Sequence, residues 1–222
     1  MNTRPLVIAH RGFSARHPEN TLPAIRGALD LGVDFIEIDV HETRDGQLVV
    51  FHDYRLNRIC GVRGRVRHRT VAELQSLNPN IPTLEETLLT CRGKARVLVE
   101  IKRADPRKVA ALIERLALER EVIVFSLSAR RMRILTAANP RLVCFGLIAH
   151  NPRSKIRNLR FPVAGLALSR RLVTSRRVVE RIHQRGWKLF VWTVNRATEM
   201  QRLADWGVDG LITDHPDRAL KL

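Results

Sequence analysis

RVLVEIKRADPRKVAALIERLALEREVIVFSLS, residues 96–128, is the stretch of sequence that decides the fold. Its opening, RVLVEIK (96–102), is a short and mostly aliphatic run, which predicts a buried strand. Residues 105–119 carry apolar side chains at helical spacing, and Pro106 stands in the first turn, where proline is favoured. Residues 122–128 then predict a second strand. A helix between two such strands is typical of a crossover that joins parallel strands in one sheet.

The same alternation of strand and helix continues along the rest of the chain. Further strands are expected at residues 5–10, 34–40, 47–52, 142–149, 164–169, 188–195 and 209–214. Further helices are expected at residues 20–32, 83–91, 129–139, 174–186 and 197–207. About eight strands in one α/β chain favour a closed (β/α)₈ TIM barrel over an open sheet.

Two connections depart from this alternation. Asp45 and Gly46 form a strong turn signal, so the strands at 34–40 and 47–52 are expected to form a hairpin. Residues 53–82 are rich in Gly and Arg and are expected to form a short inserted loop after the second barrel strand, near one rim. At 222 residues the chain is somewhat shorter than the ~250 residues of a typical barrel, and we expect a single domain over residues 1–222.

Acidic residues interrupt two of the apolar strands. Glu37 and Asp39 lie within FIEIDV (35–40), and Glu100 lies within RVLVEIK. Residues i and i+2 of a strand share a face, so Glu37 and Asp39 are expected to point together into the barrel mouth. Glu100 and Lys102 repeat the pattern. These residues lie at the C-terminal ends of their strands, which is where barrel enzymes carry their chemistry.

Three converging carboxylates repel one another unless a cation holds them, because an isolated buried charge is costly. An oxygen-only ligand set selects a hard divalent ion, Mg²⁺ or Ca²⁺, over zinc. Glu37, Asp39 and Glu100 therefore predict a site for one divalent cation. The alternative, in which these acids pair with neighbouring arginines, stays open at this point.

Two histidines, His10 and His52, also lie at strand ends and suit proton transfer, because imidazole titrates near neutral pH. Arg11 and Lys102 add positive charge beside the predicted cation. A hard metal, two histidines and two cations together favour phosphoryl chemistry. His41 lies near the predicted site in the sequence and is expected to be structural. The remaining histidines are expected to be structural or surface residues: His17, His68, His150, His183 and His215.

The formal net charge of +17 suggests nucleic acid or an anionic membrane surface as a partner. The basic residues are spread along the whole chain, however, and the aromatic residues that would stack on nucleic acid bases are scarce. We therefore expect a solvated basic surface that attracts anions. At most, transient contact with an anionic membrane surface is expected, and no specific nucleic acid partner.

No apolar run approaches the ~20 residues needed to cross a bilayer, and the apolar stretch near Met1 is too short for a secretory signal. These features predict a cytoplasmic protein. Its three widely spaced cysteines, Cys60, Cys91 and Cys144, predict reduced thiols rather than a disulfide framework or a zinc site.

A set of motifs in fixed order resembles the glycerophosphodiester phosphodiesterase family over residues 7–217. The motifs are AHRG (9–12), PENT (18–21), EIDV (37–40), FHD (51–53), IPTLEE (81–86), EIK (100–102), VWTVN (191–195) and GVDGLITDHP (207–216). By resemblance, the site residues are the metal ligands Glu37, Asp39 and Glu100, the acid–base pair His10 and His52, and the phosphate contacts Arg11 and Lys102. Asn20 and Trp192 would shape the substrate pocket, with helix capping by Asn20 and barrel packing by Trp192 as equal alternatives.

The resemblance also implies a reaction, the hydrolysis of a glycerophosphodiester to sn-glycerol 3-phosphate and an alcohol. The glycerol 2-hydroxyl would attack first and give a cyclic phosphate, and the partner is a small anionic phosphodiester. Where many relatives carry a larger insertion after the His-Asp pair, residues 58–77 keep only a short connection. A more open pocket is therefore expected, with room for a bulkier head group.

Two alternatives stay open: a lysophospholipase D that acts on lysophospholipids, and a non-catalytic barrel that binds anions or nucleic acid. The head group of the substrate, the choice between Mg²⁺ and Ca²⁺ and the oligomeric state are not determined by the sequence.

Overall fold

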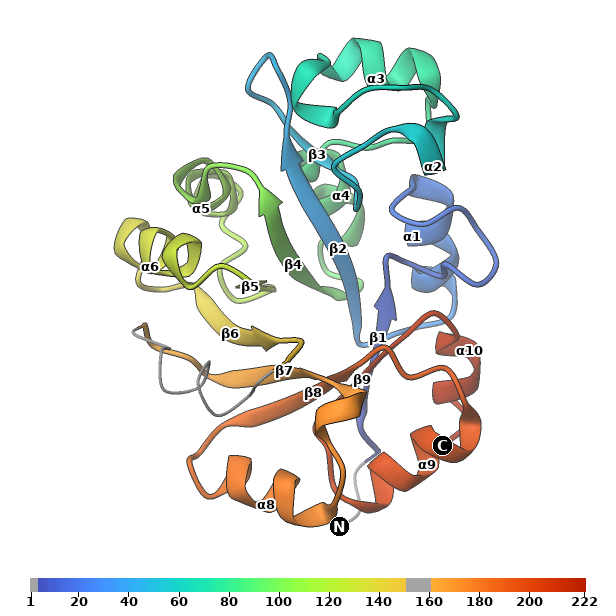
Figure 1. Cartoon of the computed structure of the whole chain (residues 1–222), viewed down its shortest axis with the longest axis vertical. Coiled ribbons are helices and arrows are strands. Elements are labelled where there is room, and N and C mark those ends of the chain that lie inside the picture. Colours follow the sequence, from blue (N-terminus) through green and yellow to red (C-terminus); the bar gives the residue numbers. More distant parts are fainter. Residues whose placement is uncertain (1–3, 151–160) are drawn as a thin grey trace.

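Strands and helices alternate along the computed structural model, which describes residues 4–150 and 161–222 (Figure 1). The strands are β1 (Leu6–His10), β2 (Phe35–Glu42), β3 (Leu48–Val50), β4 (Arg96–Arg103), β5 (Val122–Ser126), β6 (Val143–Ile148), β7 (Gly165–Ser169), β8 (Lys188–Trp192) and β9 (Gly210–Thr213). The α-helices are α1 (Leu22–Asp30), α2 (Asn57–Cys60), α3 (Val71–Leu77), α4 (Leu84–Cys91), α5 (Pro106–Arg115), α6 (Ala129–Ala138), α8 (Arg176–His183), α9 (Ala197–Asp205) and α10 (Pro216–Ala219). Short 3₁₀ helices are η1 (Val66–His68) and η2 (Arg170–Leu172).

The strands form a closed parallel barrel. Their spatial order is β1-β9-β8-β7-β6-β5-β4-β2, and β1 pairs again with β2 to close the ring. In the described part of the chain, β3 adds to the outside of this ring, antiparallel to β2, with Val40 opposite Val50. The predicted (β/α)₈ TIM barrel and the predicted hairpin are both confirmed. Gly46 takes the positive φ of 76° in the turn between β2 and β3.

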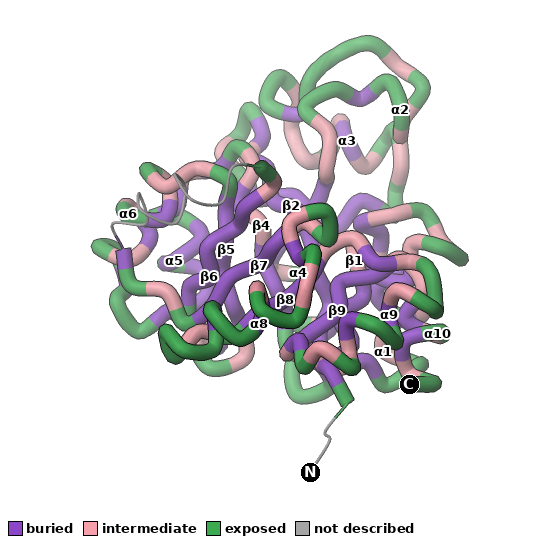
Figure 2. The backbone as a smooth tube through the Cα atoms, turned by 60° about the horizontal axis from the view of Figure 1, so that its bottom comes forward, coloured by how far each residue is buried: buried purple, intermediate pink, exposed green. Residues whose placement is uncertain are grey.

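The barrel strands are buried over most of their length (Figure 2). Apolar residues form two layers, one on each side of these strands. The outer layer, between strands and helices, includes Ile36 and Ile38. The inner layer fills the barrel with larger side chains, namely Ile8, Phe35, Leu98, Ile123, Phe125, Phe145, Leu147, Ala167, Phe190 and Ile212. Since alternate residues of β2 face the interior, Glu37 and Asp39 follow Phe35 on the inner face, towards the mouth.

Gly165 at the start of β7 makes room for the aromatic part of the inner layer. A Cβ at this position would lie 2.5 Å from the carbonyl oxygen of Lys188 and 2.6 Å from the Phe145 ring. Both distances are far below van der Waals contact, so a larger residue at this position would force the barrel interior to shift.

The loop between β1 and α1 brings two polar residues against β2. Thr21 caps α1 by accepting a hydrogen bond from the Ala24 N–H at 3.4 Å, so the alternative in which Asn20 caps this helix is wrong. Gly12 has a φ of 78°, and a Cβ there would lie 2.6 Å from the backbone of Ala24. Arg11 and Asn20 also have positive φ values, 59° and 57°. The loop therefore turns sharply at Arg11 and at Asn20, and these turns place the two side chains beside β2.

Residues 53–82 are more structured than the plain loop expected from their composition. They contain α2, η1 and α3, and Thr70 and Glu73 form a reciprocal capping box at the start of α3. Their apolar side chains form a small core with the hairpin: Val49, Phe51, Leu56, Val66, Leu74 and Ile81. The expectation of a loop was wrong because these apolar positions are spread thinly among Gly and Arg. We call residues 53–82 the inserted segment; it forms a lobe beyond the end of β2 (Figure 1).

Cys60, Cys91 and Cys144 are all free thiols, as the sequence predicts. Burial raises the pKa of Cys91 and of Cys144 to about 12. Among the described residues, no helix combines the length and the apolar character that a bilayer crossing requires.

Candidate active site

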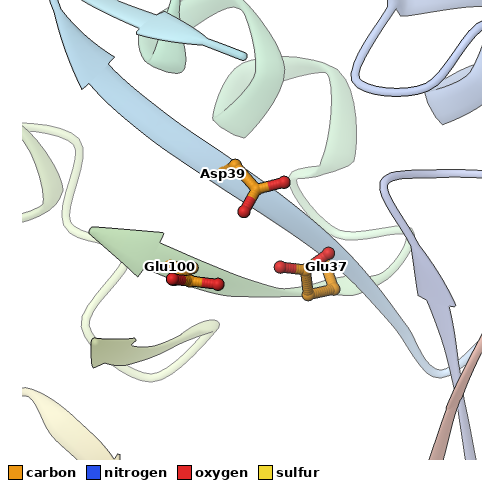
Figure 3. Close-up of side chains that lie close together, drawn as sticks. All are labelled: Glu37, Asp39 and Glu100. Carbon is orange, nitrogen blue, oxygen red and sulfur yellow. The ribbon is translucent and has the colours of Figure 1, made fainter. Parts of the chain in front are cut away.

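Three carboxylates converge at the barrel mouth (Figure 3). Glu37 and Asp39 come from β2, and Glu100 comes from β4, where it pairs with Asp39 across the two strands. One carboxylate oxygen from each residue lies within 4.8 Å of the others. Glu37 and Asp39 are 2% and 1% exposed. The strand pattern thus correctly predicts that these three acids meet.

Two basic side chains neutralise part of this acidic cluster. Lys102 Nζ lies 3.1 Å from Glu100 Oε1 and 3.6 Å from Asp39 Oδ1. Arg11 Nε lies 3.3 Å from Asp39 Oδ2. Glu37 accepts a hydrogen bond from the Arg11 backbone N–H at 3.1 Å, but no Lys or Arg side chain of the described residues pairs with it. Pairing with basic residues therefore accounts for Asp39 and Glu100 and leaves Glu37 uncompensated.

The pKa values of the three acids follow this imbalance. Burial, followed by repulsion from Asp39, raises the pKa of Glu37 well above its usual value. The same two causes raise the pKa of Glu100 to about 7. Burial acts to raise the pKa of Asp39 too, but the charges of Arg11 and Lys102 outweigh it and the pKa is lowered. The protein's own cations thus lower the pKa of Asp39, whereas the pKa of Glu100 stays raised despite its ion pair with Lys102 and that of Glu37 is raised as well.

The cluster fits a hard divalent cation. All the donors are carboxylate oxygens, which Mg²⁺ and Ca²⁺ prefer, and a further positive charge would offset the repulsion around Glu37. Asn20 supports this arrangement from behind. Its Nδ2 donates to Asp39 Oδ2 at 3.0 Å, and its Oδ1 accepts from the Asp39 backbone N–H at 3.3 Å. Partners of this kind fix the orientation of a ligating carboxylate.

His10 stands at the end of β1, next to the acidic cluster. Its Nδ1 lies 2.6 Å from Asp214 Oδ1, and its Nε2 lies 4.0 Å from Glu37 Oε2. Asp214 also accepts hydrogen bonds from Ser14 Oγ at 3.1 Å and from Asn195 Nδ2 at 2.6 Å. A carboxylate held on Nδ1 fixes the proton there, so Nε2 is the nitrogen that is free to take or give a proton.

His52 follows the hairpin and reaches the barrel mouth. Like His10, it has a carboxylate beside its Nδ1. Its Nδ1 lies 2.6 Å from Asp53 Oδ1. Burial lowers the pKa of His52, although the Asp39 charge acts in the opposite direction. His41 Nε2 lies 3.1 Å from the His52 carbonyl oxygen, and burial lowers the pKa of His41 to about 4. His41 is therefore a buried neutral residue, in agreement with the structural role predicted for it.

Arg58 of the inserted segment joins two parts of the site. Its guanidinium binds both oxygens of Asp53, with Nε to Oδ2 at 2.7 Å and Nη2 to Oδ1 at 2.9 Å. It also binds both oxygens of Glu19, at 2.6 and 2.9 Å. Glu19 in turn accepts a hydrogen bond from Arg11 Nη1 at 2.9 Å. One arginine thus holds the carboxylate behind His52 and the carboxylate behind Arg11.

A cavity of about 230 Å³ opens over the cluster. Its polar wall is formed by His10, Arg11, Glu37, His52, Glu100 and Lys102. Its apolar wall is formed by Phe125, Leu127, Leu147, Trp192 and Ile212. Trp192 donates from Nε1 to the carbonyl oxygen of Ala167 at 3.1 Å, so it packs in the barrel and lines the cavity at once. Asn20 is absent from the described lining and acts through Asp39.

The family model described as glycerophosphoryl diester phosphodiesterase family matches residues 10–218. The chain belongs to this family. It is 32% identical to a glycerophosphodiester phosphodiesterase of Caldanaerobacter subterraneus, covering 99% of this chain and 98% of that protein. A second relative, from Bacillus altitudinis, is 31% identical over 97% of both chains. The enzyme prediction is therefore confirmed, and the non-catalytic alternative falls away.

Solved structures of phosphodiesterases share the fold. A glycerophosphodiester phosphodiesterase from Thermotoga maritima superposes with a TM-score of 0.84 at 28% identity, covering 99% of this chain and 98% of that one. A phosphodiesterase from Oleispira antarctica, in complex with the product sn-glycerol-3-phosphate, gives a TM-score of 0.87 at 25% identity, covering 98% and 96%.

The structure adds residues to the candidate site that the sequence reasoning missed. Asp53 and Asp214 lie behind the two histidines, Glu19 lies behind Arg11, and Arg58 joins Asp53 to Glu19. Asp53, Glu19 and Asp214 stand inside the FHD, PENT and GVDGLITDHP motifs, so the motifs carried the signal. Arg58 stands outside every quoted motif, and only its position in the Gly- and Arg-rich segment marked it.

Proposed function

We propose that the protein hydrolyses glycerophosphodiesters to sn-glycerol 3-phosphate and an alcohol, and that it requires a divalent cation held by Glu37, Asp39 and Glu100. One observation carries the proposal: two members of this carboxylate cluster, Glu37 and Glu100, line the same small cavity as His10 and His52. The named activity of the relatives and the product bound to the Oleispira neighbour support the same substrate class. Mg²⁺ and Ca²⁺ both suit the donor set.

Two basic groups bind the phosphate in this proposal. Arg11 reaches the cavity with a guanidinium whose buried Nε forms an ion pair with Asp39 at 3.3 Å but no hydrogen bond within the described residues. Lys102 lies beside Glu100 on the same wall. When bound, the cation supplies further positive charge that offsets the charge on the phosphate oxygens. Arg11 and Lys102 orient the diester, with the leaving alcohol directed away from the cluster.

The two histidines move the protons. The glycerol 2-hydroxyl attacks phosphorus, and its proton passes to Nε2 of one histidine. The bond between phosphorus and the alcohol oxygen breaks, and the other histidine protonates that oxygen. Water then attacks the cyclic phosphate, the bond from phosphorus to the glycerol 2-oxygen breaks, and that oxygen regains a proton. Asp53 and Asp214 keep both imidazoles in the tautomer that leaves Nε2 facing the cavity.

The decisive experiment measures release of sn-glycerol 3-phosphate from glycerophosphocholine by the wild type, His10→Ala and Glu37→Gln. Loss of one acid–base group should lower kcat by about 10²–10⁴-fold. A chelator should abolish activity, and added Mg²⁺ or Ca²⁺ should restore it. Glu85→Gln is the matched control, because Glu85 is an exposed acid paired only with Arg115 among the described residues. Wild-type rates in folded His10→Ala and Glu37→Gln would show that the site is elsewhere.

Lysophospholipids are a second candidate substrate class. The apolar wall of the cavity ends at Leu127, whose side chain is 49% exposed at the rim. An acyl chain that leaves the cavity over Leu127 would cover this apolar surface. A comparison of turnover of glycerophosphocholine and lysophosphatidylcholine tests the candidate, which is excluded if the lyso-lipid is not cleaved.

A further inference from the structure

A second cavity adjoins the cavity that holds the carboxylate cluster. Its volume is about 690 Å³, and it lies between the end of β7 and the start of α9. Every residue that lines it is polar or charged: Arg170, Thr193, Asn195, Arg196, Thr198, Glu199 and Arg202. Three arginines against one glutamate give the lining a formal charge of +2 (3 − 1). We call it the arginine cavity.

The two cavities meet at Thr193, which lines both. Of the cavities described in residues 4–150 and 161–222, the arginine cavity is the one that shares a residue with the carboxylate cavity. Asn195 forms a second connection, because it lines the arginine cavity and donates to Asp214, the partner of His10. A ligand in the arginine cavity therefore adjoins the carboxylate cavity at Thr193, on the side of Asp214 and His10.

The size of the carboxylate cavity makes this neighbour relevant to the substrate. At about 230 Å³, it is smaller than the ~300–1,000 Å³ of a typical small-molecule site. It holds the glycerol phosphate part of a diester, while the alcohol part must extend past it. The shared residue Thr193 marks one direction in which the alcohol can extend.

The charges of the arginine cavity are arranged to receive an anion. Arg170 and Arg202 lie 3.3 and 3.4 Å from Glu199 Oε1, so one carboxylate is shared by two guanidinium groups. Arg196 has no ion pair and no side-chain hydrogen bond within the described residues. It is also the N-cap residue that precedes α9, and it makes no side-chain capping hydrogen bond there. Guanidinium groups bind phosphate and carboxylate oxygens in a bidentate manner.

We propose that the arginine cavity binds an oxyanion on the leaving alcohol, so that the enzyme favours glycerophosphodiesters whose alcohol carries a second phosphate or a carboxylate. The proposal rests on the proposed function and specifies its substrate class. Neutral and cationic head groups would leave the cavity filled with water and would gain nothing from its charge.

A matched pair of substrates tests the proposal: glycerophosphoglycerol, with a neutral alcohol, and the same compound phosphorylated on its terminal hydroxyl. The wild type should show a kcat/KM several-fold higher for the phosphorylated compound. In Arg170→Gln/Arg196→Gln, the ratio of the two kcat/KM values should fall by about tenfold, the lower end for charge-assisted hydrogen bonds at an exposed site. Glycerophosphoserine, as a third substrate, separates carboxylate from phosphate recognition.

The control variant is Arg130→Gln/Arg133→Gln, which removes two arginines from a cavity between α5 and α6 that has no contact with the carboxylate cavity. This variant should keep the wild-type ratio. An equal ratio in the wild type and in Arg170→Gln/Arg196→Gln overturns the proposal.

Calorimetric binding to folded His10→Ala separates this proposal from the proposed function. If the phosphorylated compound binds no more tightly than glycerophosphoglycerol, the arginine cavity is not an anion site, whatever the enzyme hydrolyses. If the phosphorylated compound binds more tightly, and Arg170→Gln/Arg196→Gln removes this gain in affinity, the arginine cavity is an anion site. This conclusion holds even if the enzyme hydrolyses neither compound.

Discussion

Substitution of Asp214 by Asn tests the link between the barrel mouth and the proposed acid–base chemistry. The change keeps the shape of the side chain and removes its charge. Asp214 Oδ1 accepts from His10 Nδ1 and Ser14 Oγ, and Oδ2 accepts from Asn195 Nδ2. The asparagine amide has one oxygen, which accepts, and one NH₂ group, which donates. On the side of the NH₂ group, two hydrogen-bond donors therefore face each other, and that hydrogen bond is lost.

The size of the effect follows from these contacts. A hydrogen bond to a charged group contributes about 1.5–3 kcal/mol, and the His10 contact, at 2.6 Å, is short. If this contribution stabilises the transition state, in which the imidazole carries a full positive charge, each 1.36 kcal/mol is a factor of ten in rate. We therefore expect Asp214→Asn to lower kcat by about 10- to 100-fold, with KM changed by less than threefold.

Steady-state hydrolysis of glycerophosphocholine measures this effect, with thermal unfolding as a check on folding. Asp209→Asn is the matched control, since Asp209 also binds a histidine, His183, at 2.8 Å, but at the N-terminal end of β9, away from the mouth. It should leave kcat unchanged. The reasoning fails if Asp214→Asn stays within twofold of the wild type, or if Asp209→Asn loses as much activity.

Three further predictions concern metal, packing and pH. Mg²⁺ or Ca²⁺ at about 100 times its Kd should add about 2.7 kcal/mol to the free energy of unfolding of the wild type. In a thermal shift assay, Glu37→Gln should lose most of this gain. An equal gain in the wild type and in Glu37→Gln would contradict the ligand assignment. Gly165→Ala should lower the free energy of unfolding by about 1–3 kcal/mol in urea, because its Cβ would meet the Lys188 carbonyl at 2.5 Å; an unchanged midpoint would contradict this. Burial acts to raise the pKa of Asp209, but hydrogen bonds, of which the one from Lys188 is the strongest, outweigh burial and lower this pKa. The contribution of Asp209 to the free energy of unfolding is therefore present above its unfolded pKa of about 3.9 and is lost as the pH falls below that value. Urea unfolding at pH 6 and at pH 3 should accordingly show a smaller difference for Asp209→Asn than for the wild type, and equal differences would refute it.

Much of the site could be predicted because strand geometry is local. Side chains alternate across a strand, so the spacing of Glu37 and Asp39 alone turns both inward. The order of the barrel then brings Glu100 of β4 beside them. The positions of the two histidines could be predicted as well. His10 ends its strand at the barrel mouth, and His52 comes where the hairpin returns the chain to the mouth.

The supporting residues could not be predicted in this way. Asp214 is 204 positions from His10, and no periodic pattern relates the two. The role of Asn20 depended on the exact start of α1. Thr21 caps this helix, whereas Asn20, one position earlier, binds Asp39. The inserted segment packs around six apolar side chains that are scattered singly over residues 49–81, and local composition does not reveal that they form one core.

Arg58 connects the inserted segment to the site of the proposed reaction in the barrel. Its hydrogen bonds to Asp53 and Glu19 are lost whenever the segment opens, and the supports of His52 and Arg11 are lost with them. The segment packs in a small apolar core that it shares with the hairpin and that is separate from the barrel core, and such units open locally at a lower free energy than the whole protein. In a urea titration, activity should therefore disappear before the fluorescence of Trp187, Trp192 and Trp206 changes, because these tryptophans lie in the barrel half formed by β7 to β9. The fraction of active molecules is then set by the stability of about 30 residues rather than by that of the barrel.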